Sequence, residues 1–276
     1  MKKFSIKAPA KINLTLEILN KRDDGFHNIQ TIMHTISLCD VLDFEVENAS
    51  ENKIELSGNN LEIPYDEKNL VYKACIEFLN YAKIENTEIK CFINKKIPVA
   101  AGLAGGSTDA AATLKVLNKI FKDPLTKKQL NEICAKLGSD LNFMLEGGCA
   151  LCTSRGEIVE PISKFSSFVS LVKPKNLGIS AKEAYQKCTQ RGYKQGLNNT
   201  TKLKKLIEQN KFDKNLITND LERALVEDYA ILKFIKEKVP NAVMSGSGST
   251  FFVLEKQLPY KFDENEFEVF EGFIFV

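Results

Sequence analysis

A glycine-rich segment ahead of a helical pattern carries the clearest chemical signal in the sequence. Gly102, Gly105 and Gly106 allow positive φ angles and close approach of a ligand to the backbone. Ser107 and Thr108 follow them and open a predicted helix, whose first amides point back toward the glycines. Converging amides at the positive end of a helix dipole suit a phosphate group. The segment predicts an anion site, although a structural turn with a serine cap fits the same composition.

Spacing excludes two familiar nucleotide-binding loops. No Gly-Lys-Ser or Gly-Lys-Thr follows the glycines, so the segment is not a Walker A loop. The glycines at 102, 105 and 106 also do not fit the G-x-G-x-x-G fingerprint of dinucleotide-binding folds. A phosphate site here therefore requires another kind of loop.

Composition narrows the class of protein. With 276 residues, 43% hydrophobic and 27% charged, the chain can bury one large core or two smaller ones. Its 38 Lys and Arg against 36 Asp and Glu leave a formal charge of +2, so nucleic acid is not an expected partner.

Targeting signals and metal motifs are weak. No apolar run approaches the roughly 20 residues of a membrane span, and the N-terminal residues lack the apolar core of a signal peptide. Seven cysteines include one CxxC pair, Cys149 and Cys152, which we interpret as small buried hydrophobes rather than a zinc or redox site. We expect a cytoplasmic protein with no membrane partner.

The elements that must position these residues mix strands and helices. Strand patterns cover 6–18, 29–46, 88–93, 149–153, 168–172, 242–244 and 250–254. Helical patterns cover 69–82, the residues after the glycines, 126–138 with a capping box from Thr126 and Gln129, a short segment at 139–145, and 181–187. The longest helix is expected from Asn219 to the residue before Pro240. The layout predicts an α+β fold.

Three ordered segments resemble the motifs of GHMP kinases, the class of galactokinase, homoserine kinase and mevalonate kinase. Residues 98–114, PVAAGLAGGSTDAAATL, resemble the central phosphate-binding motif. Residues 8–18, APAKINLTLEI, resemble the N-terminal motif, and residues 244–252, MSGSGSTFF, resemble the C-terminal glycine motif. Three matches in order over nearly the whole chain are more specific than any single glycine loop. The resemblance implies a two-lobed fold with domains at 1–155 and 156–276, and with ATP and substrate in the cleft between the lobes.

Shorter segments narrow the resemblance to the diphosphocytidyl-methylerythritol kinase branch of the non-mevalonate isoprenoid pathway. They are Asp24-Gly-Phe-His, Gly138-Ser-Asp-Leu-Asn-Phe and Arg155-Gly-Glu. The implied reaction is phosphorylation of the 2-hydroxyl of a cytidine diphosphate-linked methylerythritol by ATP and Mg²⁺, by a monomer or homodimer. Two alternatives stay open: a GHMP kinase for mevalonate, homoserine or a sugar, and a non-catalytic nucleotide-binding module.

The resemblance assigns catalysis to Lys11 and Asp140. Taken alone, Lys11 reads as a solvated lysine on a strand, and Asp140 as an ordinary acid at a helix start. As family residues, Lys11 is the catalytic lysine, suited to charge stabilisation because it is cationic at neutral pH, and Asp140 takes the proton of the acceptor hydroxyl. The two lie far apart in sequence, so their pairing is a tertiary prediction.

The resemblance also assigns binding residues. Asn69 and Lys95 are expected to line the adenine pocket, and the Ser107 hydroxyl is a candidate Mg²⁺ ligand. His27 is expected to hydrogen-bond the cytosine, with Phe26 or Tyr185 stacking on it. The remaining nucleotide-loop residues are Pro98, Val99, Ala100, Ala101, Gly102, Leu103, Ala104, Gly105, Gly106 and Thr108, and the remaining substrate residues are Asn13, Gly246 and Gly248.

Five positions depart from the family pattern. Ala104 and Ser154 stand where the family usually has glycine, Phe26 where it has Tyr, Thr108 where it has Ser, and Asn142 where it has Pro. None removes a charged group, but Ala104 and Asn142 put the geometry of their loops in question.

Overall fold

The computed structural model describes residues 1–163, 165–192 and 198–276. Contacts within the chain divide it into two compact units built from interleaved segments. The first comprises Met1–Ala10, Leu38–Val99 and Ala104–Glu146, and the second comprises Lys11–Ser37, Ala100–Leu103 and Gly147–Val276. The division of the sequence into family domains at residue 155 stays a prediction.

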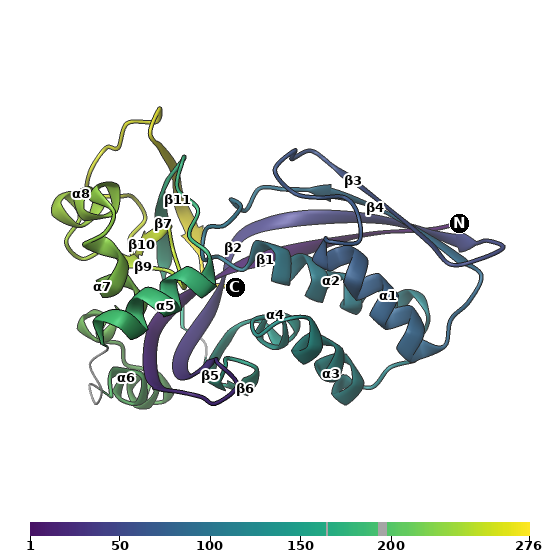
Figure 1. Ribbon diagram of the computed structural model, residues 1–276, viewed down its shortest axis with the longest axis horizontal. Coiled ribbons are helices and arrows are strands. Elements are labelled where there is room, and N and C mark those ends of the chain that lie inside the picture. The colour runs from purple at the N-terminus through teal and green to yellow at the C-terminus, as the bar shows by residue number, and fades with distance from the viewer. Residues whose placement is uncertain (164, 193–197) are drawn as a thin grey trace. The chain divides into compact units, whose positions relative to one another are not determined.

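The first unit places four helices on one sheet (Figure 1). Strands β1 (Lys2–Lys21) and β2 (His27–Asn48) run through both units, and in this one they continue to β4 (Thr87–Asn94) and β3 (Lys53–Gly58) in the order β3-β4-β2-β1. β4 is antiparallel to β2 and parallel to β3. One face of these strands is covered by α1 (Leu70–Ala82), α2 (Gly105–Ile120), α3 (Lys127–Leu137) and α4 (Leu141–Glu146).

Side-chain periodicity explains this layer. Phe44 and Ile89 alternate inward from β2 and β4, and Phe78 and Leu114 face them from α1 and α2 in one apolar core. The capping box predicted for α3 is present: the Thr126 hydroxyl accepts from the Gln129 amide and the Gln129 side chain accepts from the Thr126 amide.

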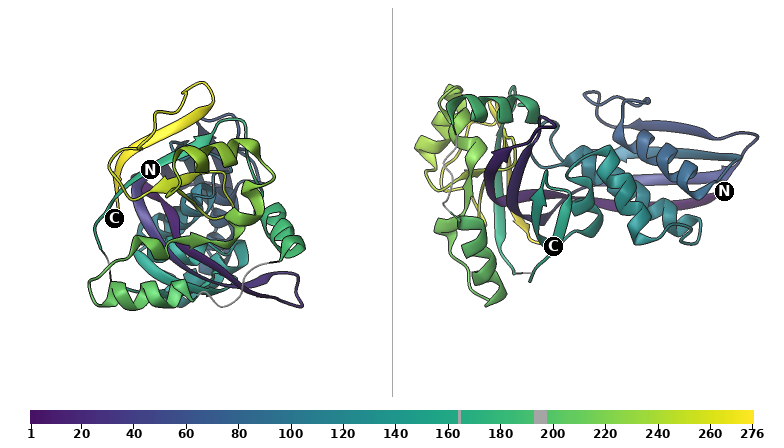
Figure 2. Two further views of the ribbon diagram at one scale, coloured as in Figure 1. Left: turned by 90° about the vertical axis from the view of Figure 1, so that its left-hand side faces the viewer. Right: turned by 60° about the horizontal axis from the view of Figure 1, so that its bottom comes forward.

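The second unit contains the other pairings of β1 and β2, and also a separate sheet. β2 here pairs with β5 (Cys149–Ser154), β5 with β6 (Ile158–Pro161), and β1 with β8 (Thr218–Asn219). A separate sheet runs in the order β11 (Phe267–Ile274), β7 (Phe168–Pro174), β10 (Phe251–Val253), β9 (Val243–Met244). In Figure 2 the yellow strand β11 lies at its edge. The other elements are α5 (Ala181–Arg191), α6 (Asn199–Glu208), the 3₁₀ helix η1 (Lys214–Leu216), α7 (Asp220–Val226) and α8 (Ala230–Lys238).

Helices α5, α7 and α8 supply Ala184, Leu225 and Ile235 to a second core, which contains Phe251 and Phe267 from the separate sheet. The α+β class is therefore confirmed. Within the described residues, no helix combines the length and apolar character needed to cross a bilayer.

The predicted long helix at 219–239 is wrong. Two helices, α7 and α8, replace it, separated by a turn at 227–229. The helix is interrupted at Tyr229, which is extended with φ −122° and ψ 106°, and Asp228 in that turn pairs with Lys187 and Arg191 of α5. Within α7, the Glu222 carboxylate accepts the Met244 amide of β9 at 2.8 Å. Strands β3, β6, β8 and β11 were not predicted.

Candidate functional site

Three segments that the motifs singled out meet within the second unit. The Lys11 Nζ donates to Asn13 Oδ1 at 2.7 Å and to the Gly102 carbonyl at 3.0 Å. The Ser245 hydroxyl donates to the same Gly102 carbonyl at 3.0 Å. Lys11 and Asn13 are almost completely buried. A strand lysine, the middle of the first glycine segment and the second glycine segment are thus brought to one place.

Glycine is required where these backbones meet. A Cβ on Gly102, whose φ is +73°, would lie 2.0 Å from the Ser245 carbonyl oxygen and 2.9 Å from the Gly248 nitrogen. A Cβ on Gly246 would lie 3.0 Å from the Gly102 oxygen and 3.1 Å from the Lys11 Nζ. Gly102 and Gly246 therefore allow close contact between the two segments. Gly248 belongs to the same turn, because its backbone N–H donates a hydrogen bond to the Ser245 carbonyl at 2.9 Å.

Asn219 supports this glycine turn and was recognised in the sequence only as a helix cap. Its Nδ2 donates to the Met244 carbonyl at 2.6 Å and to the Gly246 carbonyl at 2.8 Å, while its Oδ1 accepts the Leu221 amide at the start of α7. One buried amide thus joins the turn to the helix. The sequence position of Asn219 does not indicate this role, because the glycine turn comes close to it only in the folded chain.

The second half of the first glycine segment belongs to the first unit and opens α2. Ala104 is left-handed, with φ 58° and ψ 32°, so the family's usual glycine is replaced by a residue that still adopts the glycine-like conformation. Gly106 is exposed, Ser107 is half-buried and Thr108 is buried, with its amide bonded to the Ala104 carbonyl at 2.8 Å. The preceding first-turn amides have no partner within a helix, as an anion site requires.

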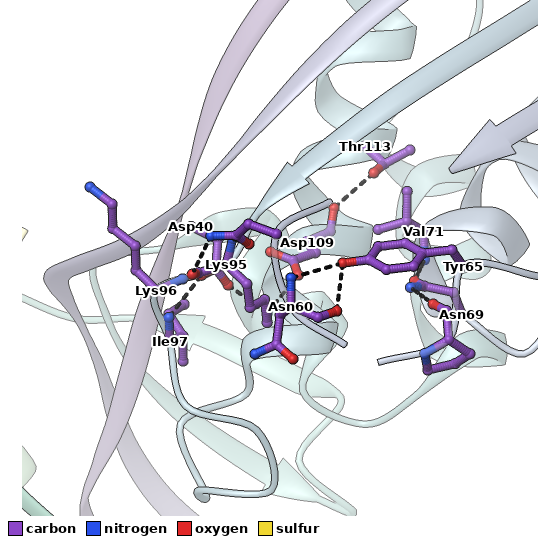
Figure 3. Close-up of polar contacts among 12 residues, drawn as sticks. Asp40, Asn60, Tyr65, Asn69, Val71, Lys95, Lys96, Ile97, Asp109 and Thr113 are labelled. Carbon is purple, nitrogen blue, oxygen red and sulfur yellow. Dashed lines mark hydrogen bonds and ion pairs between the residues drawn. The ribbon is translucent and has the colours of Figure 1, made fainter. Parts of the chain in front are cut away.

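A buried ion triad lies beneath this helix start (Figure 3). Lys95 Nζ is 2.5 Å from Asp40 Oδ2 and 2.7 Å from Asp109 Oδ2, and all three side chains are at most 4% exposed. Asp40 Oδ1 also accepts the Lys96 amide at 2.5 Å and the Ile97 amide at 2.8 Å. A Cβ on Gly105 would lie 2.9 Å from the Lys95 Nζ. The triad therefore ties β2, the end of β4 and α2 together directly under the loop.

The triad has an uneven charge balance of two carboxylates against one ammonium. Burial raises the pKa of Asp109 to about 7 although the Lys95 charge opposes the rise. Burial lowers the pKa of Lys95, but the two carboxylates outweigh it and the net direction is upward. Asp109 Oδ1 has no hydrogen-bond partner among the described residues. Sequence reasoning missed Asp40 and Asp109, although Asp109 directly follows the Ser-Thr pair of the motif.

The side chains of Lys95 and Asn69, which are predicted to line the adenine pocket, both have partners within the protein. The Lys95 ammonium is held by the triad, and its amide donates to Asn59 Oδ1 at 2.7 Å. Asn69 caps α1: its Oδ1 accepts the Val71 amide at 2.9 Å and its Nδ2 donates to the Pro64 carbonyl at 2.6 Å (Figure 3). Their contact with adenine stays a prediction.

Asp140 immediately precedes the short helix α4 in the first unit, as predicted. Its carbonyl accepts the Met144 amide at 3.0 Å, and the Met144 carbonyl accepts the Lys115 ammonium from α2 at 3.1 Å. Asn142, in place of the family's proline, donates to the Asn131 carbonyl of α3 at 3.2 Å. Neighbouring helices therefore anchor the segment that carries Asp140. Lys11 belongs to the other unit, so the pairing of Lys11 with Asp140 stays a prediction.

The predicted nucleobase residues gather in the second unit. The His27 and Tyr185 rings stack with centroids 5.2 Å apart and an interplanar angle of 18°. His27 Nε2 lies 2.8 Å from the Thr189 hydroxyl, and burial, followed by the nearby Lys21 charge, lowers the pKa of His27. Phe26 sits in the turn between β1 and β2 with 51% of its surface exposed. An exposed aromatic beside a largely neutral imidazole suits a planar base.

The donor set near the loop fits Mg²⁺ better than a transition metal. In the parts of the chain that the structure describes, no group of three or more His, Cys, Asp and Glu could hold a metal ion. Ser107 offers one half-buried hydroxyl at the helix start. Mg²⁺ commonly takes one or two protein oxygens and completes its shell with phosphate and water oxygens. The two cysteines of the CxxC pair, Cys149 and Cys152, are both buried, in agreement with our interpretation of them as small buried hydrophobes.

Comparison with known proteins agrees with the motifs. The family model for the GHMP kinases N terminal domain matches residues 69–153. A 4-diphosphocytidyl-2-C-methyl-D-erythritol kinase of Clostridium perfringens is 37% identical, with 98% of this chain and 97% of the relative covered. The same-named protein of Thermoanaerobacter pseudethanolicus is 40% identical, with 91% and 87% covered.

Solved structures show the same fold. A crystal structure of 4-(cytidine 5'-diphospho)-2C-methyl-D-erythritol kinase superposes with a TM-score of 0.74 at 27% identity, covering 91% of this chain and 90% of that one. Homoserine kinase from Cytophaga hutchinsonii superposes with a TM-score of 0.66 at 16% identity, covering 93% and 86%. The chain belongs to the 4-diphosphocytidyl-2-C-methyl-D-erythritol kinase family of the GHMP kinases.

Proposed function

We propose that this kinase transfers the γ-phosphoryl group of ATP to the 2-hydroxyl of 4-(cytidine 5'-diphospho)-2-C-methyl-D-erythritol, giving the 2-phosphate and ADP. The observation that carries the proposal is the convergence of Lys11, Gly102 and Gly246, since it joins all three family motifs in one buried arrangement. The near full-length similarity to kinases of that name supports the choice of acceptor.

The donor nucleotide is bound by the glycine segment and the start of α2. The backbone amides around Gly105, Gly106 and Ser107 donate hydrogen bonds to the phosphate oxygens at the positive end of the helix dipole. The Ser107 hydroxyl would be a protein ligand for Mg²⁺, which would neutralise charge on the phosphates when bound. The triad below keeps the loop and the helix in register, since Asp40 holds the chain at 96–97 and Asp109 holds α2.

Asp140 and Lys11 act on the acceptor side. Asp140 accepts the proton of the 2-hydroxyl while that oxygen bonds to the γ-phosphorus and the bond to the β-phosphate oxygen breaks, releasing ADP. A carboxylate is an adequate base, because phosphoryl transfer depends mainly on alignment and charge neutralisation. The Lys11 ammonium, fixed by Asn13 and the Gly102 carbonyl, stabilises negative charge on the transferring group.

The cytidine end provides selectivity. Phe26 offers an exposed ring face on which a nucleobase would stack, and we assign the hydrogen bond to the base to the neighbouring His27. Mevalonate, homoserine and simple sugars have no base to use this surface. The second candidate, a GHMP kinase with one of those acceptors, therefore leaves Phe26 and His27 without a role.

A phosphorus NMR assay tests the proposal. ATP, Mg²⁺ and the protein are incubated in parallel with the cytidine diphosphate-linked methylerythritol, mevalonate, homoserine and a hexose. The expected result is ADP together with one new phosphomonoester resonance, in the first mixture only. Transfer to another alcohol would replace the proposed acceptor, and nucleotide binding without transfer would support the non-catalytic module instead. We further expect a cytoplasmic location. We also expect a monomer or homodimer, and sedimentation of the purified protein checks this oligomeric state.

A further inference from the structure

The Arg155-Gly-Glu segment has so far no role in the reaction, yet it contacts the nucleobase surface. The Arg155 guanidinium carbon lies 5.0 Å from the centroid of the Phe26 ring, within the range of a cation–π contact. Phe26 is 51% exposed, and the Arg155 guanidinium lies over its ring. One face of the ring is therefore covered by Arg155.

The two turns that carry these residues are neighbours because of strand register. β2 pairs with β5 so that Ile29 lies opposite Ser154, which brings the turn after β5 beside the turn before β2. The Ser154 hydroxyl, where the family usually has glycine, bridges them: it accepts from Arg22 Nη1 at 3.0 Å and donates to Glu157 Oε1 at 3.0 Å. Ser154 is left-handed, with φ 63°, so it keeps the glycine conformation and adds a hydrogen-bonding group.

Both turns are internally braced. Arg22 donates to Asp24 through Nε and Nη2, and Asp24 Oδ1 accepts the Phe26 amide at 3.1 Å. In the other turn Glu157 Oε2 accepts the Arg155 amide at 2.8 Å, and its Oε1 lies 3.6 Å from Arg155 Nε. The backbone of Phe26 and the base of the Arg155 side chain are thus each fixed. Since Asp24 and Glu157 balance the two arginines, the cluster is not a free cationic site for phosphate.

We propose that Arg155 is a positioning residue for nucleobase recognition, which stacks on one face of Phe26 and presents the other face to the cytosine of the acceptor. An aromatic ring ordered before binding loses less rotational freedom when the base stacks on it, which improves affinity. The guanidinium plane substitutes for the packing that an exposed ring lacks. This inference rests on the proposed function, because it requires a base-carrying acceptor.

The test is a double-mutant cycle of Arg155→Ala and Phe26→Ala, with steady-state kinetics on the cytidine diphosphate-linked methylerythritol. We expect Arg155→Ala to raise KM for the acceptor about twofold to fivefold, the range of a cation–π contact at an exposed site, with kcat and KM for ATP unchanged. Arg155→Lys, which keeps the charge but loses the planar group, should fall between the wild type and Arg155→Ala. In the Phe26→Ala background, Arg155→Ala should have no further effect, because the residue acts through the ring.

Competition by cytidine monophosphate provides a second readout. The inhibition constant of this nucleotide should rise in Arg155→Ala by the same factor as KM, whereas a merely structural role would also lower kcat. Arg223→Ala, which removes an exposed arginine of α7 in the same unit, is the matched control and should leave both constants unchanged.

Additive effects of the two substitutions would overturn the proposal, and so would an unchanged acceptor KM in an active Arg155→Ala variant. If the wild-type protein itself transfers no phosphate to this acceptor, the proposed function fails instead. The two failures are therefore distinguishable.

Discussion

At the scale of single residues, Asp140 is the group whose chemistry is easiest to isolate. Its carboxylate is assigned to the acceptor hydroxyl and its backbone anchors α4, so Asp140→Asn removes the base and keeps the shape. We expect kcat to fall about 10²-fold or more, as for other general bases, with KM for ATP unchanged. Steady-state kinetics with both substrates varied provide the check. Equal losses in kcat and ATP affinity would point to a structural role.

Asp109 is expected to make stability depend on pH. Its pKa of about 7 in the folded chain exceeds that of an unfolded aspartate, about 3.9. Between these values the folded chain holds a proton that the unfolded chain releases, so the free energy of unfolding decreases as pH rises from about 4 to about 7.

Asp109→Asn should remove this decrease, on the order of a few kcal/mol, while keeping the size of the side chain. Urea unfolding at pH 5 and pH 8, with EDTA and without nucleotide, compares the two proteins. The same loss of stability toward high pH in the variant would rule out Asp109 as its source.

At the scale of elements, the decisive contact is between two glycine turns. Gly102→Ala would place a methyl group 2.0 Å from the Ser245 carbonyl oxygen while φ stays at +73°. We expect a loss of at least ~2 kcal/mol in the free energy of unfolding, together with weaker nucleotide binding, because backbone atoms cannot move aside as a side chain can.

Gly147→Ala is the matched control for that substitution. Gly147 has nearly the same φ, +74°, but nothing lies within 4 Å of its missing Cβ. Only the left-handed conformation should then cost stability, about 1 kcal/mol. Equal destabilisation of the two variants in denaturant titrations would mean that the contact with Ser245 contributes nothing.

At the scale of the whole molecule, ligands should stabilise the chain by mass action. A non-hydrolysable ATP analogue with Mg²⁺ at 100 times its Kd should raise the free energy of unfolding by about 2.7 kcal/mol. Asp140→Asn should keep this gain, since Asp140 is assigned to the acceptor. Differential scanning calorimetry is the measurement, and no upward shift of the melting temperature with saturating analogue would contradict nucleotide binding by this chain.

Local pattern predicted much of the chain correctly. The capping box of α3, the presence of strand β1 and the helix after the glycines follow from short-range propensity and periodicity. The helix expected from Asn219 onward is interrupted where Tyr229 is extended, in a turn whose Asp228 pairs with Lys187 and Arg191 of α5, contacts that no local pattern contains. Strand β11 was missed because its sequence does not alternate regularly between apolar and polar residues, and two of its apolar residues, Val269 and Ile274, are exposed.

By itself, the sequence determined the kind of chemistry, because glycines before a helix, a strand lysine and a second glycine cluster occur in a family order. It could not determine which groups meet. Folding set Lys11 on the Gly102 carbonyl, buried Asp40 and Asp109 against Lys95, and placed Arg155 over Phe26. These contacts join residues 14 to 129 positions apart, and their partners are chosen by strand register and core packing rather than by local propensity.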